Sequence, residues 1–259
     1  MLTMTLPQAP AMFSTANPSE PEPVSAQAQS SSADNARRIA SALDQIAEAL
    51  APRRRIMRGG ERLFHMGAPL QQLHVLNSGM FKLIGVSNDG REQIVAFRFR
   101  GDWLGLGDLE SGQYNCDAVA LDTCEVWSVG YVELLEACGR RPALLKQILE
   151  SMSGEMQRER EAALSAYTLP ADARMAEFLS RWVAALTRRG LRADQLNLPL
   201  TRAEIGNHLG MTLETASRAL SRLAQADVIR IDEKSRREIT VPDASQLENY
   251  VRQRVAAGV

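Results

Sequence analysis

The sequence predicts an α+β protein in which a β-roll, one long helix and a small C-terminal domain follow one another along the chain. Short alternating runs of polar and apolar residues fill positions 53–129, and glycine-ended turns separate them. Such alternation is typical of half-buried strands in an antiparallel sandwich or roll. After Tyr131 the apolar residues recur at three- and four-residue steps, which indicates helices. The 259 residues are enough for one large domain or two small ones.

Composition limits the classes of protein to which the chain can belong. The formal net charge of −1 favours neither a polyanion nor an acidic partner, so any basic surface must be local. Cys116, Cys124 and Cys138 form no CxxC pair, and this usage fits a reducing cytoplasm. No run approaches the roughly 18 apolar residues of a membrane span, and no basic side chain precedes Arg37. We therefore expect a cytoplasmic protein without a membrane segment or a secretory signal.

Residues 1–33 are predicted to form a disordered tail, because they are rich in Pro, Ala, Ser and Gln and contain few large apolar side chains. A helix is expected to begin at Asp34, a favourable N-cap, and to end before Pro52. Its apolar residues keep helical spacing at Ile39, Leu43, Ile46 and Leu50. This helix leads into the roll, and together they form a predicted domain over residues 34–141.

One β-hairpin is predicted within the roll. The stretch MFKLIGVSNDGREQIVAFRF contains two alternating runs on either side of Asn88-Asp89-Gly90. A glycine-ended turn between two such runs is the usual signature of paired antiparallel strands.

A long helix is predicted over residues 142–169, where Pro142 takes the favoured first position. One apolar stripe runs along it, and a helix of this length exceeds what the core of one small domain needs. We therefore predict a parallel coiled-coil seam between two subunits. The predicted dimer-interface residues are Leu145, Ile148, Met152, Met156 and Ala163. An ordinary core helix is the alternative interpretation.

The C-terminal domain is predicted over residues 170–259, and its informative segment is TRAEIGNHLGMTLETASRALSRL. Thr201 and Thr212 are placed to cap two short helices, with Gly210 in the turn between them. Gly206 stands where the two helices would approach most closely. The inward positions are small or apolar: Ile205, Leu209, Met211, Ala216, Ala219, Leu220 and Leu223. This pattern predicts a helix-turn-helix, and an αα-hairpin of a helical bundle is the alternative.

The outward face of the second helix carries Glu214, Ser217 and Arg218 at i, i+3 and i+4. Their carboxylate, hydroxyl and guanidinium groups match base edges in the DNA major groove, although a solvated helix face could show the same pattern. A hairpin-like segment, VIRIDEKSRREITV, and a last helix near residues 247–255 follow. The further predicted DNA contacts are Thr201, Arg202, Thr212, Thr215, Arg222, Lys234 and Arg236.

With a β-roll, a long dimer helix and a C-terminal winged helix-turn-helix, the chain resembles the CRP/FNR family of bacterial transcription regulators from about Asn35 onward. GREQIVAFRFRGDWLG, LLKQILESMSGEM and the pattern Glu-x-x-Ser-Arg at 214–218 are similar to the FNR branch. The resemblance implies a cyclic-nucleotide-binding-like roll (a double-stranded β-helix) and a homodimer on double-stranded DNA palindromes with TTGAT half-sites. Arg218 would contact the guanine, and Glu214 the paired cytosine strand. The resemblance also implies contacts with RNA polymerase during promoter activation. Repression of promoters is an alternative that the sequence leaves open.

The chain departs from both sensing chemistries of this family. FNR-type oxygen sensors hold a 4Fe–4S cluster with four cysteines, whereas only Cys124 here matches a cluster position. Members that bind cyclic AMP use a Gly-Glu and an Arg-Ser pair, and the matching residues here are Gly105-Leu106 and Tyr114-Asn115. A buried cyclic phosphate would then lack a charge partner. We predict no iron–sulfur cluster, no cyclic AMP and no other cofactor, and leave an unidentified effector of the roll open.

No arrangement typical of an enzyme is present in the sequence. His65, His74 and His208 are far apart, without the H-x-H or HExxH spacing of a metal site. A haem bound by His74 and a metal-dependent enzyme built on the same roll stay as alternatives. The main rival function is a ligand-sensing β-roll that regulates another protein through contacts of its C-terminal domain.

Overall fold

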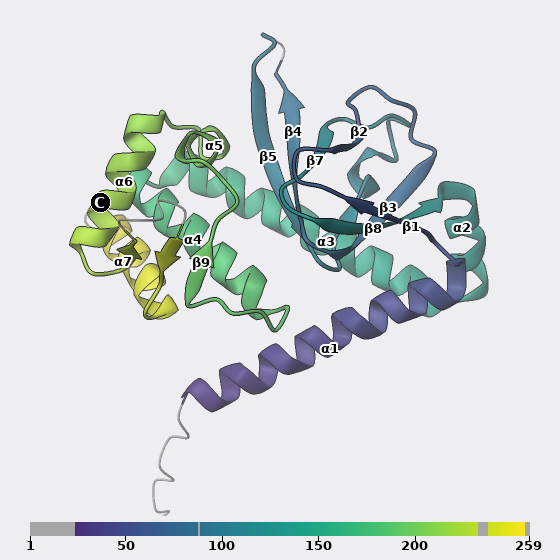
Figure 1. Ribbon diagram of the computed structural model, residues 1–259, viewed down its shortest axis with the longest axis horizontal. Coiled ribbons are helices and arrows are strands. Elements are labelled where there is room, and N and C mark those ends of the chain that lie inside the picture. Colours follow the sequence, from purple (N-terminus) through teal and green to yellow (C-terminus); the bar gives the residue numbers. More distant parts are fainter. Residues whose placement is uncertain (1–23, 88, 233–237, 257–259) are drawn as a thin grey trace, which may run out of the picture.

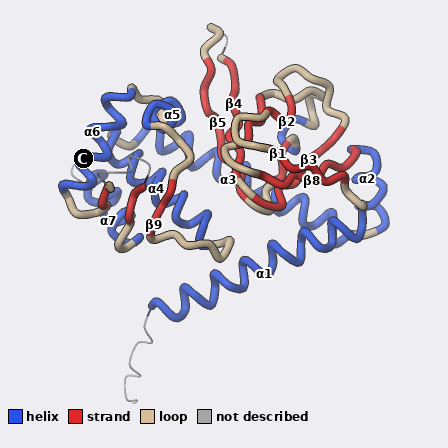
Figure 2. The backbone as a smooth tube through the Cα atoms, viewed as in Figure 1, coloured by secondary structure: helices blue, strands red, loops and turns tan. Residues whose placement is uncertain are grey.

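The computed structural model describes residues 24–87, 89–232 and 238–256, with residues 24–30 described by their backbone alone. A β-roll with its helices forms one body, and a small helical domain with a short sheet forms the other (Figure 1). The strands concentrate in the roll, while helices join and surround the two bodies (Figure 2). The predicted α+β class is therefore confirmed.

The first helix, α1, spans Val24–Leu50, so the predicted start at Asp34 is wrong. The segment after Pro23 holds only Val, Ser, Ala and Gln up to Ala33, and none of these residues breaks a helix. The added turns are anchored, because the Ser32 hydroxyl donates to the carbonyl of Thr187 in the small domain. Residues 1–23, which make up the rest of the predicted tail, lie outside the described residues.

The roll consists of two four-stranded antiparallel sheets. In sheet order, the first holds β1 (Arg53–Met57), β8 (Cys124–Gly130), β3 (Gln72–Ser78) and β6 (Trp103–Leu104). The second holds β2 (Arg62–Phe64), β7 (Asp117–Ala120), β4 (Met80–Val86) and β5 (Glu92–Phe99). The predicted hairpin is β4–β5, in which Met80 faces Phe99 and Val86 faces Glu92. Its strand β5 stands at the edge of its sheet.

Two helices follow the roll. Helix α2 (Tyr131–Arg140) follows β8 directly. Within the roll itself, a 3-10 turn at Leu106–Asp108 precedes β7. Helix α3 (Pro142–Thr168) contains 27 residues and is therefore about 40 Å long. Its first turns pack Leu144 and Ile148 into a core shared with α1, α2 and the roll.

The small domain begins with α4 (Ala171–Thr187) and contains the helices α5 (Arg202–His208), α6 (Leu213–Gln225) and α7 (Ala244–Ala256). Its three-stranded sheet has the order β10 (Arg230–Ile231), β11 (Glu238–Thr240) and β9 (Gln195–Asn197). Met175, Leu179, Leu196, Leu220 and Leu223 form its fully buried centre. Phe99 of the roll joins this same core, so the two bodies are in direct contact. Across the described part of the chain, no helix has the length and apolarity needed to cross a membrane.

Candidate nucleic-acid interface

The first helix of the candidate interface, α5, begins at a reciprocal cap. The Thr201 hydroxyl accepts a hydrogen bond from the Glu204 N–H at 3.1 Å, and a Glu204 carboxylate oxygen accepts from the Thr201 N–H at 2.8 Å. This arrangement satisfies two backbone N–H groups that have no partner inside the helix. Thr201 therefore holds the start of α5 while it remains exposed at the surface.

The turn between α5 and α6 depends on two glycines. A Cβ atom on Gly206 would lie 2.8 Å from the Met211 carbonyl oxygen and 3.3 Å from that of Thr212. Gly210 has a φ of +62°, a backbone conformation that glycine adopts at little cost. Leu209 and Met211 pack partly buried against the core of the domain. The predicted helix-turn-helix geometry is present at each of these positions.

Helix α6 has one buried face and one exposed face. Its N-cap residue Thr212 accepts a hydrogen bond from the Thr215 N–H at 3.2 Å. The buried residues are Ala216, Ala219, Leu220 and Leu223, as the sequence predicted. The helix lies on the outer side of the small domain, with α5 between it and the β4–β5 hairpin (Figure 1).

The exposed face of α6 presents the predicted trio. Glu214 and Arg218 are exposed and Ser217 is half-buried. Hydrogen bonds from its own backbone N–H and from the Thr212 hydroxyl lower the pKa of Glu214, so its carboxylate stays ionised at neutral pH. A carboxylate that accepts hydrogen bonds, a hydroxyl and a guanidinium thus stand together at the start of a helix that faces solvent. Such a set can pair with the base edges of a DNA major groove.

Leu213, the first residue of α6, is a member of this surface that the sequence analysis missed. Its side chain is 48% exposed, so it is open to solvent on the same helix as the trio. It precedes Glu214 and lies one helical turn before Ser217, so its methyl groups border the polar trio. Its exposure at an N-terminal helix position could have been inferred, since the inward positions of α6 were already assigned.

Arg222, one of the predicted DNA contacts, is part of an ion pair within the small domain. Its guanidinium lies 3.9 Å from the carboxylate of Asp172 at the start of α4. Asp172 is 1% exposed and also accepts hydrogen bonds from Arg254 and Tyr250 of α7. Burial alone would raise the pKa of Asp172, but these hydrogen bonds outweigh it and hold the pKa below its usual value. Arg222 therefore joins α6 to Asp172 of α4, the carboxylate that α7 also contacts.

The remaining predicted DNA contacts divide between capping residues and an undescribed segment. Thr201, Thr212 and Thr215 take part in the caps of α5 and α6, and Arg202 is half-buried in α5. Lys234 and Arg236 lie in residues 233–237, outside the described residues, although β10 and β11 on either side pair as an antiparallel hairpin. Their predicted role stays a prediction.

The predicted dimer stripe on α3 is mostly open to solvent. Leu145 and Met156 are 44% and 51% exposed, Ala163 is exposed and Met152 is half-buried. Ile148 differs, because it is 7% exposed and packs in the core of its own chain beside Leu144. Leu149, Leu164 and Tyr167 are further exposed apolar side chains of α3 that the prediction did not include.

The interior of the roll is filled by its own side chains. Tyr114 stacks on Phe64 with ring centroids 3.8 Å apart, and its hydroxyl donates to the Gln72 carbonyl at 2.6 Å. His74 lies 3.1 Å from the same hydroxyl and 2.8 Å from that of Ser128. Burial, together with the nearby charge of Arg55, lowers the pKa of His74 to about 4, so the imidazole is neutral. Tyr114, which the resemblance matched to the arginine of the cyclic-phosphate pair, is thus part of an aromatic stack; the absence of cyclic AMP stays a prediction.

The three cysteines are free, buried thiols. Cys124 is buried beside the Asp122 carboxylate. Burial is the main cause that raises the pKa of its thiol to about 12, and the contact with Asp122 adds to it. Burial also raises the pKa of Cys116 to about 12. At neutral pH both thiols are therefore protonated in this structure, and the absence of an iron–sulfur cluster stays a prediction. Within the described residues no three His, Cys, Asp or Glu side chains are grouped to hold a metal ion.

Comparisons with known proteins agree with this geometry. Residues 173–250 match the family described as the Crp-like helix-turn-helix domain, and residues 54–141 match the cyclic nucleotide-binding domain. The chain is 34% identical to the fumarate and nitrate reduction regulatory protein of Vibrio cholerae over 192 residues, which cover 74% of this chain and 75% of that one. It is 32% identical to the transcriptional activator protein Anr of Pseudomonas protegens, over 80% and 82% of the two chains.

A solved structure shares the arrangement of both bodies. FixK2 from Bradyrhizobium japonicum is 29% identical and superposes with a TM-score of 0.66. The match covers 76% of this chain and 96% of that one, so it includes the roll, the long helix and the helix-turn-helix together.

Proposed function

This chain belongs to the CRP/FNR family of DNA-binding transcription regulators, and from that premise we propose that it binds FNR-like palindromes with TTGAT half-sites as a homodimer. Each protomer contributes one helix-turn-helix. The two α6 helices enter successive major grooves, about 34 Å apart along the DNA. Members of this family are transcription regulators and not enzymes.

The observation that carries the proposal is the trio on the exposed face of α6. Arg218 has the bidentate geometry that guanine O6 and N7 accept, and the ionised Glu214 can accept from the amino group of the paired cytosine. Ser217 stands beside both. The buried face of α6 fixes the rotation of the helix, so the trio points outward as a unit.

The apolar stripe on α3 supports the homodimer. With Leu149 in the place predicted for Ile148, the stripe runs through Leu145, Leu149, Met152, Met156, Ala163 and Tyr167, at the three-, four- and seven-residue steps of a coiled-coil seam. Large exposed side chains on a helix of 27 residues are costly in water, and a second copy would cover them. The seam would place the two small domains side by side.

We further propose that the protein acts in the cytoplasm, activates promoters through contacts with RNA polymerase, and represses others. The Pseudomonas protegens relative is a transcriptional activator, and this similarity supports promoter activation. The count of only three cysteines and the stack of Tyr114 on Phe64 support DNA binding without an iron–sulfur cluster or cyclic AMP. An effector of another class remains compatible with the fold.

Gel shift with the full chain tests the proposal. The wild type is expected to bind a TTGAT palindrome and to ignore a scrambled duplex of the same length. Arg218→Ala is expected to abolish the preference for the palindrome, since one bidentate contact is worth about 1–3 kcal/mol of discrimination at each half-site. Arg192→Ala removes an exposed arginine of the same domain and should bind as the wild type does.

Two results would overturn the proposal. Equal binding by Arg218→Ala and the wild type would show that α6 does not read the bases. Failure of the wild type to bind the palindrome would favour the rival function, a roll that acts through protein contacts. Sedimentation of Leu149→Glu as a monomer, beside a dimeric wild type, would support the seam separately.

A further inference from the structure

The helix-turn-helix is attached to the roll at the open edge of strand β5. The Ile94 N–H donates to the side-chain oxygen of Asn207 at 2.6 Å, and the Asn207 amide nitrogen donates to the Glu92 carbonyl at 2.9 Å. The adjacent His208 donates from Nδ1 to the Ile94 carbonyl at 2.9 Å. One side-chain amide therefore pairs with a strand edge as a peptide unit of a neighbouring strand would. Both residues come from the last turn of α5.

A charged contact supports the start of the same helix. The Lys82 ammonium of β4 lies 2.5 Å from the Glu204 carboxylate, which also completes the cap on Thr201. Burial alone would raise the pKa of Glu204, but the hydrogen bonds from Lys82 and Thr201 outweigh it and hold the pKa below its usual value. Both ends of α5 are thus fixed to the β4–β5 hairpin.

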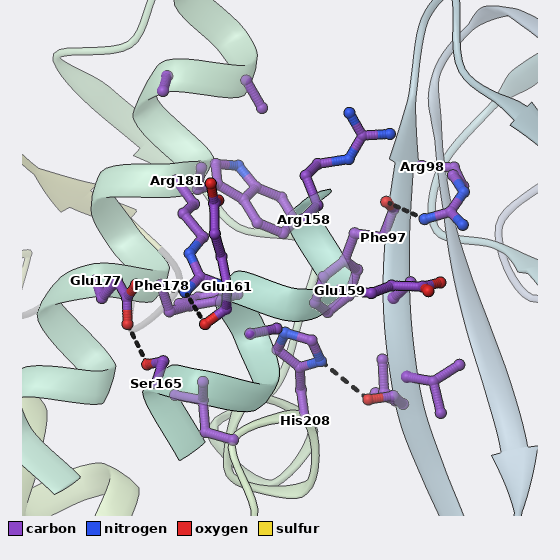
Figure 3. A pocket seen from close by; sticks show the side chains of 18 of the residues that line it. Phe97, Arg98, Arg158, Glu159, Glu161, Ser165, Glu177, Phe178, Arg181 and His208 are labelled. Carbon is purple, nitrogen blue, oxygen red and sulfur yellow. Dashed lines mark hydrogen bonds and ion pairs between the residues drawn. The ribbon is translucent and has the colours of Figure 1, made fainter. Parts of the chain in front are cut away.

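An aromatic cluster fills the space behind these polar contacts. The His208 ring meets the Phe97 ring of β5 edge to face at a centroid distance of 4.8 Å, and Phe178 and Trp182 of α4 complete the cluster. Figure 3 shows His208 beside Phe97 and Phe178, with its hydrogen bond to the strand. A cavity of about 600 Å³ opens alongside, between β5, α3 and α4. The contact between the hairpin and α5 therefore combines hydrogen bonds, an ion pair and ring contacts, with the cavity along one side.

We propose that Asn207 is a positioning residue that fixes the angle of the helix-turn-helix on the roll and so sets the half-site spacing that the dimer accepts. The inference rests on the proposed function above. Its basis is the rigid connection between Asn207 and α6. The close approach of Gly206 to the Met211 carbonyl prevents α5 and α6 from turning separately, so any rotation of α5 on the strand edge moves the reading face of α6.

The geometry of DNA makes this angle measurable. Each added base pair moves the second half-site by about 3.4 Å along the axis and turns it by about 35°. A joint that holds both small domains rigidly can match one spacing only. Once the joint is loosened, each domain can turn to follow its half-site, and the dependence of affinity on spacing weakens.

The experiment measures the affinity of the full-length dimer for palindromes whose central spacer is the best one, or one or two base pairs longer or shorter. The wild type is expected to lose about tenfold or more in affinity at each altered spacing. Asn207→Ala removes both amide bonds, which together are worth about a tenfold change in an equilibrium. It should weaken binding at the best spacing and flatten the profile to within about threefold.

Three further variants separate positioning from general damage. Asn207→Asp keeps the acceptor for the Ile94 N–H but faces the Glu92 carbonyl with a second acceptor, so it should flatten the profile as the alanine does. Lys82→Met should flatten it partially. Asn249→Ala removes an exposed asparagine of α7 that bonds only to Arg252 among the described contacts, and it should keep the wild-type profile.

The outcomes distinguish the inference from the proposed function. A variant that merely lowers stability reduces affinity at every spacing by the same factor. If Asn207→Ala keeps the sharp wild-type profile, the positioning role is wrong while the proposed function stands. If the wild type binds none of the palindromes, the proposed function itself fails.

Discussion

Arg189, just after α4, donates to the carboxylate of Asp102 in the roll across 2.9 Å. The same guanidinium donates to the carbonyls of Arg100 and Ala185, and its side chain is 6% exposed. Asp102 in turn accepts from the Phe99 N–H. The guanidinium of this ion pair is therefore buried and its carboxylate half-buried, both are hydrogen-bonded, and the pair joins the roll to the small domain.

Loss of one partner of this pair should be costly. Arg189→Met would leave the half-buried Asp102 carboxylate without its cation, and we expect the free energy of unfolding to fall by about 2–3 kcal/mol. Urea denaturation measures the change. Arg188→Met, at the exposed neighbouring position, serves as the control and should stay within about 0.5 kcal/mol of the wild type. Equal stability of the two variants would contradict the assignment.

Gly206 offers a test of the turn geometry. Gly206→Ala would place a methyl group 2.8 Å from the Met211 carbonyl, a backbone atom that cannot move aside cheaply. We expect a loss of about 1–3 kcal/mol in stability and about tenfold in affinity for the palindrome. Gly139→Ala is the matched control, because nothing lies within 4 Å of a Cβ there and alanine favours the helix. A Gly206 variant as stable as the control would show that the two helices are less tightly packed.

The buried histidine of the roll predicts a pH dependence of stability. The pKa of His74 is lowered from 6.5 to about 4 in the folded chain, so the unfolded chain binds more protons between these two values. Stability contributed by neutral His74 is therefore complete above pH 6.5 and is lost as the pH falls toward 4, to a total of about 3 kcal/mol. Denaturation at pH 7, 5.5 and 4.5 measures the slope.

Substitution isolates the contribution of this group. His74→Asn should show a shallower fall in stability over this pH range than the wild type. His65→Asn changes an exposed histidine and should keep the wild-type slope. Identical slopes in all three proteins would exclude His74 as the source.

The exposed Leu213 predicts a contact with thymine methyl groups, the only apolar feature of the base edges in the major groove. Replacing the half-site thymines by deoxyuridine removes those methyl groups alone. The wild type should lose about fourfold in affinity for each methyl contacted, from the transfer energy of one buried carbon. Leu213→Ala should bind both duplexes alike, whereas Leu191→Ala, at another exposed leucine of the domain, should keep the wild-type sensitivity.

Much of the fold follows from local sequence patterns. The β4–β5 hairpin, the caps at Thr201 and Thr212 and the buried face of α6 each depend on a few neighbouring residues, and all were predictable. The trio at 214, 217 and 218 could be placed because an inward face that is fully assigned leaves only one outward face.

The structure differs from the sequence-based predictions, or goes beyond them, where contacts with a distant segment determine the local structure. The part of α1 before Asp34 is joined to the end of α4 by the hydrogen bond from Ser32 to Thr187, which lies more than a hundred residues away and which no local pattern predicts. Ile148 fits the stripe of α3 by spacing, but α1 and α2 cover its side of the helix. The pairing of Asn207 with a strand edge, and of Arg222 with Asp172, joins residues whose proximity no periodicity encodes.

The long α1 bears on how this protein should be prepared for crystallisation. Its second half packs Leu43 and Ile46 into the roll, while its first half meets Thr187 through Ser32 and Gly190 through Ala36. A shorter version of the chain that lacks residues 1–33 would therefore lose part of this contact, which braces the roll against the small domain. Boundaries drawn at Val24 keep that brace and remove only what precedes the helix.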